Sequence, residues 1–400
     1  MRRLSNRVQQ VKPSATLAIT AKAAEMRAAG KSIISLSVGE PDFETPKAAR
    51  DAGIAAINAG FTRYTAVAGI PELRKAIAEK FKRDNDLDYS PNDILVSTGG
   101  KQCIFNLLMA VMDPGQRAVI PAPYWVSYPD MVKLAEGTPV IVNTLAENSF
   151  KISAEQLEEA LCENCKVLFL NSPSNPTGMA YTAEELASIG EVVRKYPDLI
   201  VATDDMYEKI LFDGKTFATF AQVNPDLKEQ TVTLNGVSKA YCMTGWRIGY
   251  CAGPSTIIKA MGKVQGQSTS NPNSIAQKAA LAALTGPTDE LDEMVRTYEA
   301  RRTWLVGAIN AIPGMHAIMP DGAFYVFPSV QGWIGKTTPS GITLSDDVKI
   351  CEWLLEEAGV ALVPGTEFGS PGHIRFSYAV SQDTLQDAVD RIAKAAATLA

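Results

Sequence analysis

The sequence predicts an α/β protein with a large, mostly parallel seven-stranded sheet flanked by helices, followed by a smaller α+β unit. Apolar runs alternate with helical patterns between residues 94 and 252, which is the order expected of repeated strand–helix–strand units. Several runs are continuously apolar, as in strands that helices cover on both faces. After about residue 285 the alternation ends and a long amphipathic helix begins.

The strands of the main sheet are expected where short runs rich in valine, isoleucine and leucine end at turn residues. These runs cover residues 94–98, 117–122, 138–142, 166–171, 199–204, 231–235 and 247–252. Two helices between them have clear signals. In 71–83 apolar residues recur every four positions after a proline in the first turn. The helix 182–195 begins at Thr182, whose hydroxyl can cap it.

The smaller unit is expected to contain helices at 289–312, 344–358 and 382–399 and strands at 323–328, 360–364 and 373–379. A helix over 16–29 and a strand over 32–38 precede the main sheet and are expected to join this unit. The predicted division is an N-terminal arm and part of the small domain (1–45), a large domain (46–285) and a small C-terminal domain (286–400).

Composition excludes several classes of function. The chain has 400 residues, a net charge of −6 and a pI near 5.3, without the basic stripe that nucleic acids require. No apolar run approaches the length of about 20 residues that spans a bilayer. The basic start of the chain is followed by no apolar stretch, so no signal peptide is predicted. We therefore expect a cytoplasmic protein without a nucleic-acid or membrane partner.

The chain has six cysteines and two histidines. Scattered cysteines in a chain of this size do not predict a disulfide framework. Cys162 and Cys165 have the spacing of a redox or zinc pair, but there is no second pair and only His316 and His373 could assist, so no metal site is predicted. The acid–base chemistry is expected to fall to lysine, tyrosine or carboxylate side chains.

Lys239 follows the strand-like run 231–235, and Arg247 comes eight residues later. A lysine amine can form a Schiff base with an aldehyde cofactor, and a guanidinium forks onto phosphate oxygens. Taken alone, these two residues are weak evidence, because most lysines are solvated and most arginines are surface or ion-pair residues. The residues at the other strand ends therefore decide whether Lys239 and Arg247 belong to a ligand site, because ligands bind at the carboxyl edge of such sheets.

Three further strand ends carry candidate ligand-binding residues. Gly99 and Gly100 open a helix, where bare backbone amides can approach a phosphate, although a tight turn accounts for them as well. Trp125 follows the strand 117–122 and can stack on a flat ring or simply pack in a loop. Asn175 lies in an Asn-Pro-Thr-Gly turn and can donate a hydrogen bond to a cofactor oxygen.

Two charged residues are predicted to lie in strands. Asp204 ends the strand 199–204, with Tyr207 three residues later, and a buried carboxylate needs a partner such as a protonated pyridine nitrogen, a basic side chain or a helix end. The adjacent Asp205 is expected to be the less buried of the two. Arg375 alternates with apolar neighbours and needs a carboxylate, from the protein or from a substrate.

Together these residues resemble the fold-type I pyridoxal-phosphate enzymes, specifically class I aminotransferases, and within them the bacterial subgroup of aspartate aminotransferases, some of which also act on prephenate. The resemblance covers essentially the whole chain. It includes segments 37–43, 68–74, 99–102, 123–125, 175–178 and 244–249, with Tyr64, Asp204, Tyr207, Lys239 and Arg375.

The resemblance implies pyridoxal 5′-phosphate as the cofactor and a role for each ring contact. Lys239 would hold the cofactor covalently and carry the proton at the substrate Cα. Asp204 would pair with the ring nitrogen, and Tyr207 and Asn175 would bond the phenolic oxygen. Trp125 would stack on the ring.

The phosphate would be held by Arg247, Ser238 and the backbone of residues 99–101. The resemblance also implies that Tyr64 reaches a phosphate in the neighbouring subunit, so the protein would be a homodimer with shared active sites.

For the substrate, the resemblance implies that Arg375 clamps the α-carboxylate, with Gly39, Trp125 and Asn175 beside it. We find no counterpart of the partner-subunit arginine that binds the distal carboxylate in animal-type enzymes. In the bacterial subgroup a lysine takes that part, and Lys101 is the candidate here. Lys12 is the candidate for the ring-borne carboxylate of prephenate, or is a solvated N-terminal lysine.

The function expected from this resemblance is amino-group transfer between aspartate or glutamate and 2-oxo acids, with prephenate as a further acceptor that yields arogenate. An aromatic or alanine aminotransferase is the nearest alternative. A lyase that eliminates a β-substituent from cysteine-like substrates could use the same cofactor. A non-enzymatic regulatory module would need a DNA-binding extension and a basic patch, for which the sequence offers no candidate.

Overall fold

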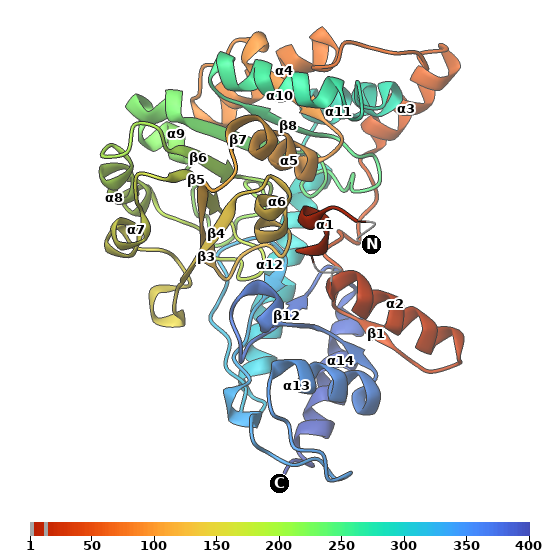
Figure 1. The fold of residues 1–400 in the computed structure, drawn as a ribbon. Coiled ribbons are helices and arrows are strands. Elements are labelled where there is room, and N and C mark those ends of the chain that lie inside the picture. Colours follow the sequence, from red (N-terminus) through yellow and green to blue (C-terminus); the bar gives the residue numbers. More distant parts are fainter. Residues whose placement is uncertain (1–3, 12–14) are drawn as a thin grey trace.

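The computed structural model describes residues 4–11 and 15–400. Figure 1 shows an upper body around a large sheet and a lower body made mainly of C-terminal elements, with the long helix α12 (Asp289–Asn310) running between them. The short helix α1 (Asn6–Gln9) lies against α6 (Tyr128–Leu134) at the junction. The division into domains at residues 45/46 and 285/286 remains our proposal.

The upper body contains all seven predicted strands, with ends shifted by at most two residues. They are β2 (Ile94–Ser97), β3 (Arg117–Ala122), β4 (Thr138–Asn143), β5 (Cys165–Asn171), β6 (Ile200–Asp204), β7 (Thr231–Gly236) and β8 (Gly249–Ala252). Their order is β2-β8-β7-β6-β5-β3-β4. Only β8 is antiparallel to its neighbours, so the prediction of a mostly parallel sheet is confirmed.

Alternate side chains of β5 enter two different hydrophobic clusters. Val167 and Phe169 pack with the cluster that includes α5 (Gly100–Val111), whereas Leu168 and Leu170 pack with the cluster that includes α8 (Ala183–Val193). Because both faces of the strand are buried, its sequence is continuously apolar instead of alternating. Because both faces of β5 are covered, polar side chains can gather only beyond the end of the strand, such as its carboxyl end.

The two helices predicted beside the sheet begin where their sequences indicate. Thr182 caps α8 in a capping box with Glu185, and Pro71 occupies the first turn of α4 (Pro71–Asn85). The remaining helices of the upper body are α3 (Lys47–Asn58), α7 (Ala154–Ala160), α9 (Phe220–Val223), α10 (Ser255–Gly266) and α11 (Ser274–Thr285).

The lower body combines the two ends of the chain. Its strands are β1 (Ile34–Ser35), β9 (Tyr325–Val326), β10 (Val360–Ala361), β11 (Val363–Pro364) and β12 (Ile374–Ser377), and its helices are α2 (Ala15–Ala28), α13 (Asp347–Trp353) and α14 (Gln382–Ala396). The early strand β1 pairs in parallel with β10.

The single strand predicted over 360–364 is two short strands in different sheets. β10 pairs with β1, whereas β11 pairs with β12, and Leu362 lies between them. A continuous apolar run does not reveal such a change of partner, because both parts are buried.

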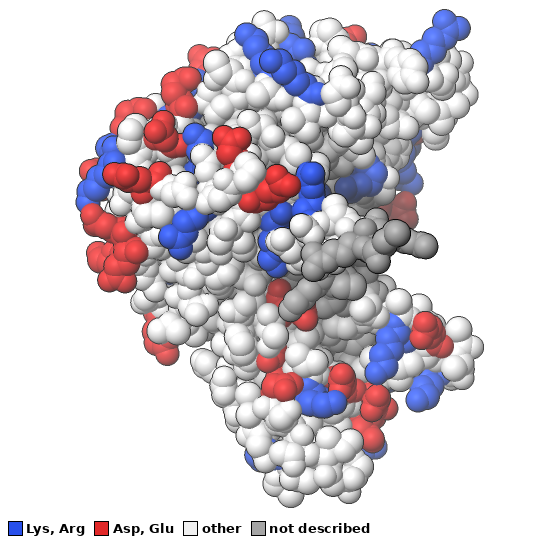
Figure 2. Space-filling view, viewed as in Figure 1, with Lys and Arg blue, Asp and Glu red and all other residues white. Residues whose placement is uncertain are grey.

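Charges of both signs are interspersed over the face shown in Figure 2. Among the described residues, no helix is both long and apolar enough to span a bilayer.

Candidate active site

A cavity of about 350 Å³ opens at the carboxyl edge of the sheet. Its lining brings together residues from both bodies of the molecule. They include Gly39, Gly100, Lys101, Trp125, Asn171, Asn175, Asp204, Tyr207, Ser238, Lys239, Arg247, Tyr325 and Arg375. The strand ends that the sequence marks separately therefore meet in one place, as parallel strands require.

Lys239 follows β7 and extends its amine into this cavity, where Nζ donates to the carbonyl oxygen of Gly39 at 2.7 Å. Removal of the amine from water, and then the positive charge of Arg375, lower the pKa of Lys239 to about 8. At pH 7 about one such amine in ten is neutral, against about one in three thousand at an ordinary lysine pKa. The site thus supplies an amine that can act as nucleophile or base.

Asp204 lies at the end of β6 and is buried. One carboxylate oxygen accepts a hydrogen bond from the Tyr128 hydroxyl at 2.6 Å, and the other faces the backbone amide of Met206 at 3.4 Å. No cation lies in ion-pair contact with it among the described residues. Burial raises the pKa of Asp204, against the opposing effect of the Tyr128 hydrogen bond. A buried carboxylate that faces a cavity without a counter-ion favours a cationic ligand.

The expectation that Asp205 is the less buried of the two aspartates is wrong. Asp205 is 1% exposed and Asp204 is 8% exposed. The carboxylate of Asp205 points away from the cavity and accepts from the hydroxyls of Thr203 and Thr219, both at 2.6 Å. Burial raises its pKa to about 7. The strand alternation, which sends neighbouring side chains to opposite faces, therefore separates a ligand-facing carboxylate from a structural one.

Arg375 is 3% exposed and projects from β12 into the cavity. Its guanidinium donates to Asn175 Oδ1 at 2.9 Å and to the carbonyl oxygen of Ser37 at 2.6 Å, while Nε has no hydrogen-bond partner among the described residues. Neither partner is a carboxylate. A buried guanidinium with unused donors and no counter-ion beside it is a receptor for a carboxylate from outside the chain.

Arg247 lies close to the start of α5, where a cradle for an anion forms. The φ of 84° at Gly99 favours glycine, and a side chain there would displace the guanidinium of Arg247. The guanidinium donates to the carbonyl oxygen of Thr244 at 2.8 Å. Gly100 begins the helix, and Ser238 lines the same cavity. Free helix amides beside an arginine suit a phosphate.

Aromatic residues close two sides of the cavity. The hydroxyl of Tyr207 lies 2.8 Å from that of Tyr325, and both rings are buried. On another side, the Lys101 ammonium lies 4.9 Å from the centre of the Trp125 ring. Partial desolvation, followed by the charge of Arg247, lowers the pKa of Lys101. Lys101 therefore presents an amine beside a flat ring surface.

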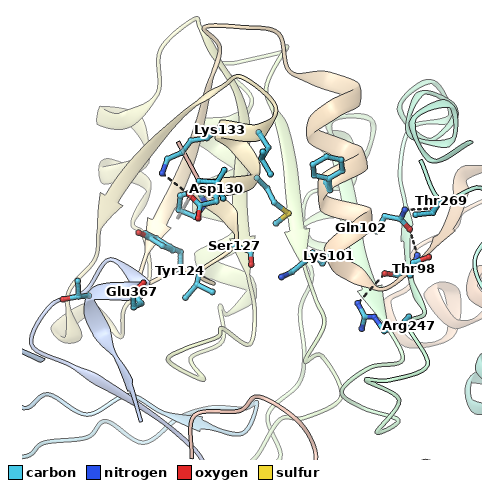
Figure 3. Close-up of a pocket in the computed structure, with 17 residues that line it drawn as sticks. Thr98, Lys101, Gln102, Tyr124, Ser127, Asp130, Lys133, Arg247, Thr269 and Glu367 are labelled. Atoms are coloured by element: carbon cyan, nitrogen blue, oxygen red, sulfur yellow. Dashed lines mark hydrogen bonds and ion pairs between the residues drawn. The ribbon is translucent and has the colours of Figure 1, made fainter. Parts of the chain in front are cut away.

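A second cavity of about 660 Å³ adjoins the first and shares Lys101, Ser127 and Arg247 with it. Figure 3 shows Lys101 and Arg247 at one wall of this space and Lys133, paired with Asp130, across it. A substrate that extends beyond the first cavity would enter this space beside the Lys101 amine.

Tyr64 is 91% exposed and does not line this cavity. Lys12 lies outside the described residues.

Sequence reasoning missed three residues that shape the site. Tyr128 supports Asp204, Tyr325 pairs with Tyr207 and lies under Arg375, and Asn171 donates to the carbonyl oxygen of Asp204 at 2.8 Å. Asn171 could have been found, because it ends a predicted strand. Tyr128 and Tyr325 reach the site from a helix and from the lower body, which no local pattern reveals.

These residues fit pyridoxal phosphate, the cofactor that the resemblance implies. The buried carboxylate of Asp204, which has no ion-pair partner among the described residues, suits a protonated ring nitrogen, and the readily deprotonated amine of Lys239 suits an aldehyde. The bare helix start at Gly99, against Arg247, suits the phosphate.

Comparison with known proteins agrees with this geometry. The family model "Aminotransferase class I and II" matches residues 31–392. The aspartate/prephenate aminotransferase of Nitrosomonas europaea is 54% identical over 98% of this chain and 99% of its own length. A crystal structure of the aspartate aminotransferase from Rhizobium meliloti has a TM-score of 0.97 and 47% identity, with 100% of both chains covered. That of the Thermus thermophilus aspartate aminotransferase with maleate has a TM-score of 0.92 and 43% identity, covering 99% and 100%.

Proposed function

Because this chain belongs to the family of class I and II aminotransferases, which use pyridoxal phosphate, we propose that it transfers the amino group of aspartate or glutamate to 2-oxo acids, with prephenate as a further acceptor. The observation that carries the proposal is the position of the Lys239 amine, whose pKa is lowered to about 8, beside the buried Asp204 carboxylate and Arg375 guanidinium, which lack an ion-pair partner among the described residues. The carboxylate of Asp204 suits the ring nitrogen of the cofactor, and the guanidinium of Arg375 suits the substrate carboxylate.

The cofactor is held by residues on three sides. Asp204 would bind its ring nitrogen, with Tyr128 fixing the carboxylate, and Trp125 would cover a ring face. The amide nitrogen of Asn175 is available for the phenolic oxygen, because its carbonyl oxygen already accepts from Arg375. Arg247, Ser238 and the amides at Gly99 and Gly100 would hold the phosphate.

Proton transfer is assigned to Lys239. Bound pyridoxal phosphate supplies an electron-withdrawing ring that makes the proton on the substrate Cα removable. The neutral form of the Lys239 amine would take that proton and return it to the carbon C4′ of the cofactor, on the other side of the substrate nitrogen. The hydroxyl of Tyr207, held by Tyr325, would stabilise charge on the phenolic oxygen.

The pKa of Lys239 predicts how fast the cofactor-free protein captures pyridoxal phosphate. Only the neutral amine reacts, so the capture rate should rise as the pH increases and level off above a midpoint near 8. Stopped-flow absorbance between pH 6 and pH 10 would measure it. A rate that keeps rising through pH 10, as for free lysine, would contradict the lowered pKa.

Lys101 is proposed to favour substrates with a second carboxylate. Its amine lies beside the Trp125 ring, at the passage to the adjoining cavity. The relative from Thermus thermophilus was crystallised with maleate, a dicarboxylate, which supports the assignment.

Replacement of Lys101 by methionine keeps most of the length of the side chain but removes its charge. We expect kcat/KM for aspartate to fall about 10–200-fold, with little change for alanine or phenylalanine. The control is Lys133→Met, across the adjoining cavity, where the ammonium is already paired with Asp130 at 3.0 Å. Equal losses on aspartate and alanine would remove Lys101 from substrate selection.

We also propose a homodimer in which each subunit completes the other's site. The side chain of Tyr64 is 91% exposed although it is aromatic, and two buried glutamines hold its loop. Gln277 accepts from the amide of Ile70 at 2.7 Å, and Gln265 donates to the carbonyl oxygen of Val67 at 2.7 Å. An ordered loop that presents an exposed tyrosine is suited to contact a second subunit.

Tyr64→Phe removes only the hydroxyl, so weaker cofactor binding is the expected result. Loss of one charge-assisted hydrogen bond to a phosphate should raise the Kd for pyridoxal phosphate about 10–150-fold. Tyr196→Phe, beyond the end of α8, is the control. A dimer of one Tyr64→Phe and one Lys239→Ala subunit should retain one tight site. Absence of tight binding in that mixed dimer would exclude sharing.

Substrate class is tested by half-reactions. Purified holoenzyme is mixed with one amino acid at a time, and the visible absorbance of the bound cofactor is followed. Conversion by aspartate and glutamate, but not by alanine or phenylalanine, would support the proposal, and oxaloacetate or prephenate should then reverse it. Conversion by phenylalanine or alanine would favour the alternative aminotransferases. Release of ammonia and pyruvate without an oxo acid would favour the lyase.

Cytoplasmic location remains part of the proposal. All six cysteines are free thiols, the usual state in a reducing compartment. Lys12 keeps its place as the candidate for the prephenate carboxylate on sequence grounds.

A further inference from the structure

Cys162 and Cys165 form a tight thiol pair outside the active site. They flank a turn between α7 and β5, which the amide of Cys165 closes by donating to the carbonyl oxygen of Cys162 at 2.9 Å. Such a turn brings its end Cα atoms within about 7 Å, the range that a disulfide requires. The two Sγ atoms are already 3.4 Å apart.

Cys162 is the more accessible and more acidic thiol. It is half-buried, whereas Cys165 is 4% exposed. A hydrogen bond from Cys165, then the Asn164 amide and the Arg117 guanidinium, lower the pKa of Cys162 despite some desolvation. The Arg117 Nη1 atom lies 3.5 Å from its sulfur, and the described residues give that guanidinium no carboxylate partner. A partly exposed thiol near a cation is the reactive kind.

Cys165 is the less accessible and the less acidic thiol of the pair. Burial is the main cause that raises its pKa, and it packs in the hydrophobic cluster on the α8 side of the sheet. The backbone amide of Cys162 donates to its sulfur at 3.4 Å, which keeps that sulfur directed at its neighbour. It therefore lacks access to solvent but has access to the sulfur of Cys162.

Neither a core role nor a metal role accounts for this arrangement. Cys103, Cys251 and Cys351 are buried core thiols, whereas Cys162 lies partly in solvent. Across the described part of the chain, no group of three or more histidine, cysteine, aspartate or glutamate side chains is placed to bind a metal ion. An attacking thiol beside a buried resolving thiol is instead the arrangement needed for exchange with a disulfide.

We propose that Cys162 and Cys165 are a redox-active dithiol that reacts with small disulfides of the glutathione class. The thiolate of Cys162 attacks one sulfur of the disulfide, a mixed disulfide forms, and one small thiolate leaves. The thiol of Cys165 then loses its proton and attacks Sγ of Cys162, so that the second small thiolate leaves. The pair is oxidised by two electrons, and the small disulfide is reduced to two thiols that carry the two protons.

The dithiol is independent of the proposed transamination. It lies at the amino end of β5, where Cys165 is opposite Arg117 of β3, whereas Asn171 at the carboxyl end of the same strand lines the active-site cavity. Transaminase activity of Cys162→Ser should therefore equal that of the wild type. If the protein proved to have no transaminase activity, the thiol measurement would still test the dithiol.

The experiment exposes holoenzyme to oxidised glutathione, alkylates the remaining free thiols and maps the modified peptides by mass spectrometry. Wild type should lose two alkylatable thiols per chain, at 162 and 165, and retain no glutathione. Cys165→Ser should keep one glutathione on Cys162, removable by a reductant. Cys162→Ser should stay unmodified at Cys165, because that thiol is buried.

Cys242→Ser is the matched control, since Cys242 is also half-buried but lies 3.4 Å from the sulfur of Met294 instead of a thiol. It should behave as wild type. Arg117→Lys and Arg117→Met should slow the first exchange, the methionine variant more. Retention of glutathione on wild-type Cys162, or modification of Cys242 while the pair stays reduced, would overturn the proposal.

Discussion

Lys239→Ala is expected to reduce the rate of transamination by at least about 10²–10⁴-fold, the range for loss of a positioned acid–base group. The reason is that no other amine in the cavity can replace it. Lys101 lies against the Trp125 ring, whereas the Lys239 amine lies among Gly39, Asp204 and Arg375. The measurement is kcat for aspartate and 2-oxoglutarate with cofactor in excess.

The controls separate chemistry from folding and cofactor loss. Lys259→Ala removes an exposed lysine of α10 and should keep full activity. Lys239→Ala should still bind pyridoxal phosphate through Asp204 and Arg247, but without the absorbance of the covalently held form. Added small primary amines should restore part of the rate, since they supply the missing base. Full turnover by Lys239→Ala would refute the mechanism.

Much of the large sheet could be predicted because its signals are local. Strands β2 to β8 are short apolar runs bounded by turn residues, and each lies within two residues of its predicted ends. The site residues at strand ends, such as Asp204 and Asn175, followed from the same pattern. Parallel strands deliver their carboxyl ends to one edge, so strand prediction already implied that these residues meet.

What could not be predicted depends on which partners a segment meets in space. The run 360–364 divides between two sheets, because its first part pairs with β1 and its second part pairs with β12. The error on Asp205 arose because Thr203 and Thr219 satisfy a carboxylate that sequence alone leaves unpaired. Tyr325 comes from the lower body, and its role follows from contacts in space with the Tyr207 hydroxyl and with Arg375, 4.7 Å from the ring centre.

The structure shows which groups of the protein contact the guanidinium of Arg375. The sequence left open a carboxylate from the protein or from a substrate. The partners in the structure are an amide oxygen and a backbone carbonyl oxygen, and Nε is unpaired. Burial lowers the pKa of Arg375, but a guanidinium still remains protonated at neutral pH. The charge therefore needs an external anion.

Arg375→Ala should lower kcat/KM for aspartate by about 30-fold to several thousandfold, the cost of truncating one partner of a buried charge pair. Arg375→Lys keeps the positive charge but loses the paired N–H donors of the guanidinium. We therefore expect an intermediate loss of kcat/KM for aspartate, about 10–150-fold. Most of the effect should appear in KM, because the α-carboxylate is bound in both the ground state and the transition state. Steady-state kinetics on the two variants would measure it.

Arg302→Lys is the matched control. Arg302 is 2% exposed, but it donates to Asp213 at 2.8 Å through two nitrogens, so its charge already has a carboxylate partner within the chain. Its replacement should lower the melting temperature and leave KM near the wild-type value. If Arg302→Lys and Arg375→Lys raised KM equally, burial of an arginine, and not a substrate contact, would explain both.

The α-carboxylate assignment makes a further distinction that a general electrostatic effect would not. Every amino acid and oxo acid carries an α-carboxylate, so Arg375→Lys should weaken aspartate, alanine and 2-oxoglutarate by the same factor. Lys101→Met should weaken only the dicarboxylates among them. A primary amine that lacks a carboxylate should react equally slowly with wild type and Arg375→Lys, because it never uses the guanidinium. If Arg375→Lys slowed that amine as much as aspartate, the guanidinium would act on the cofactor or on Lys239 and not on the substrate.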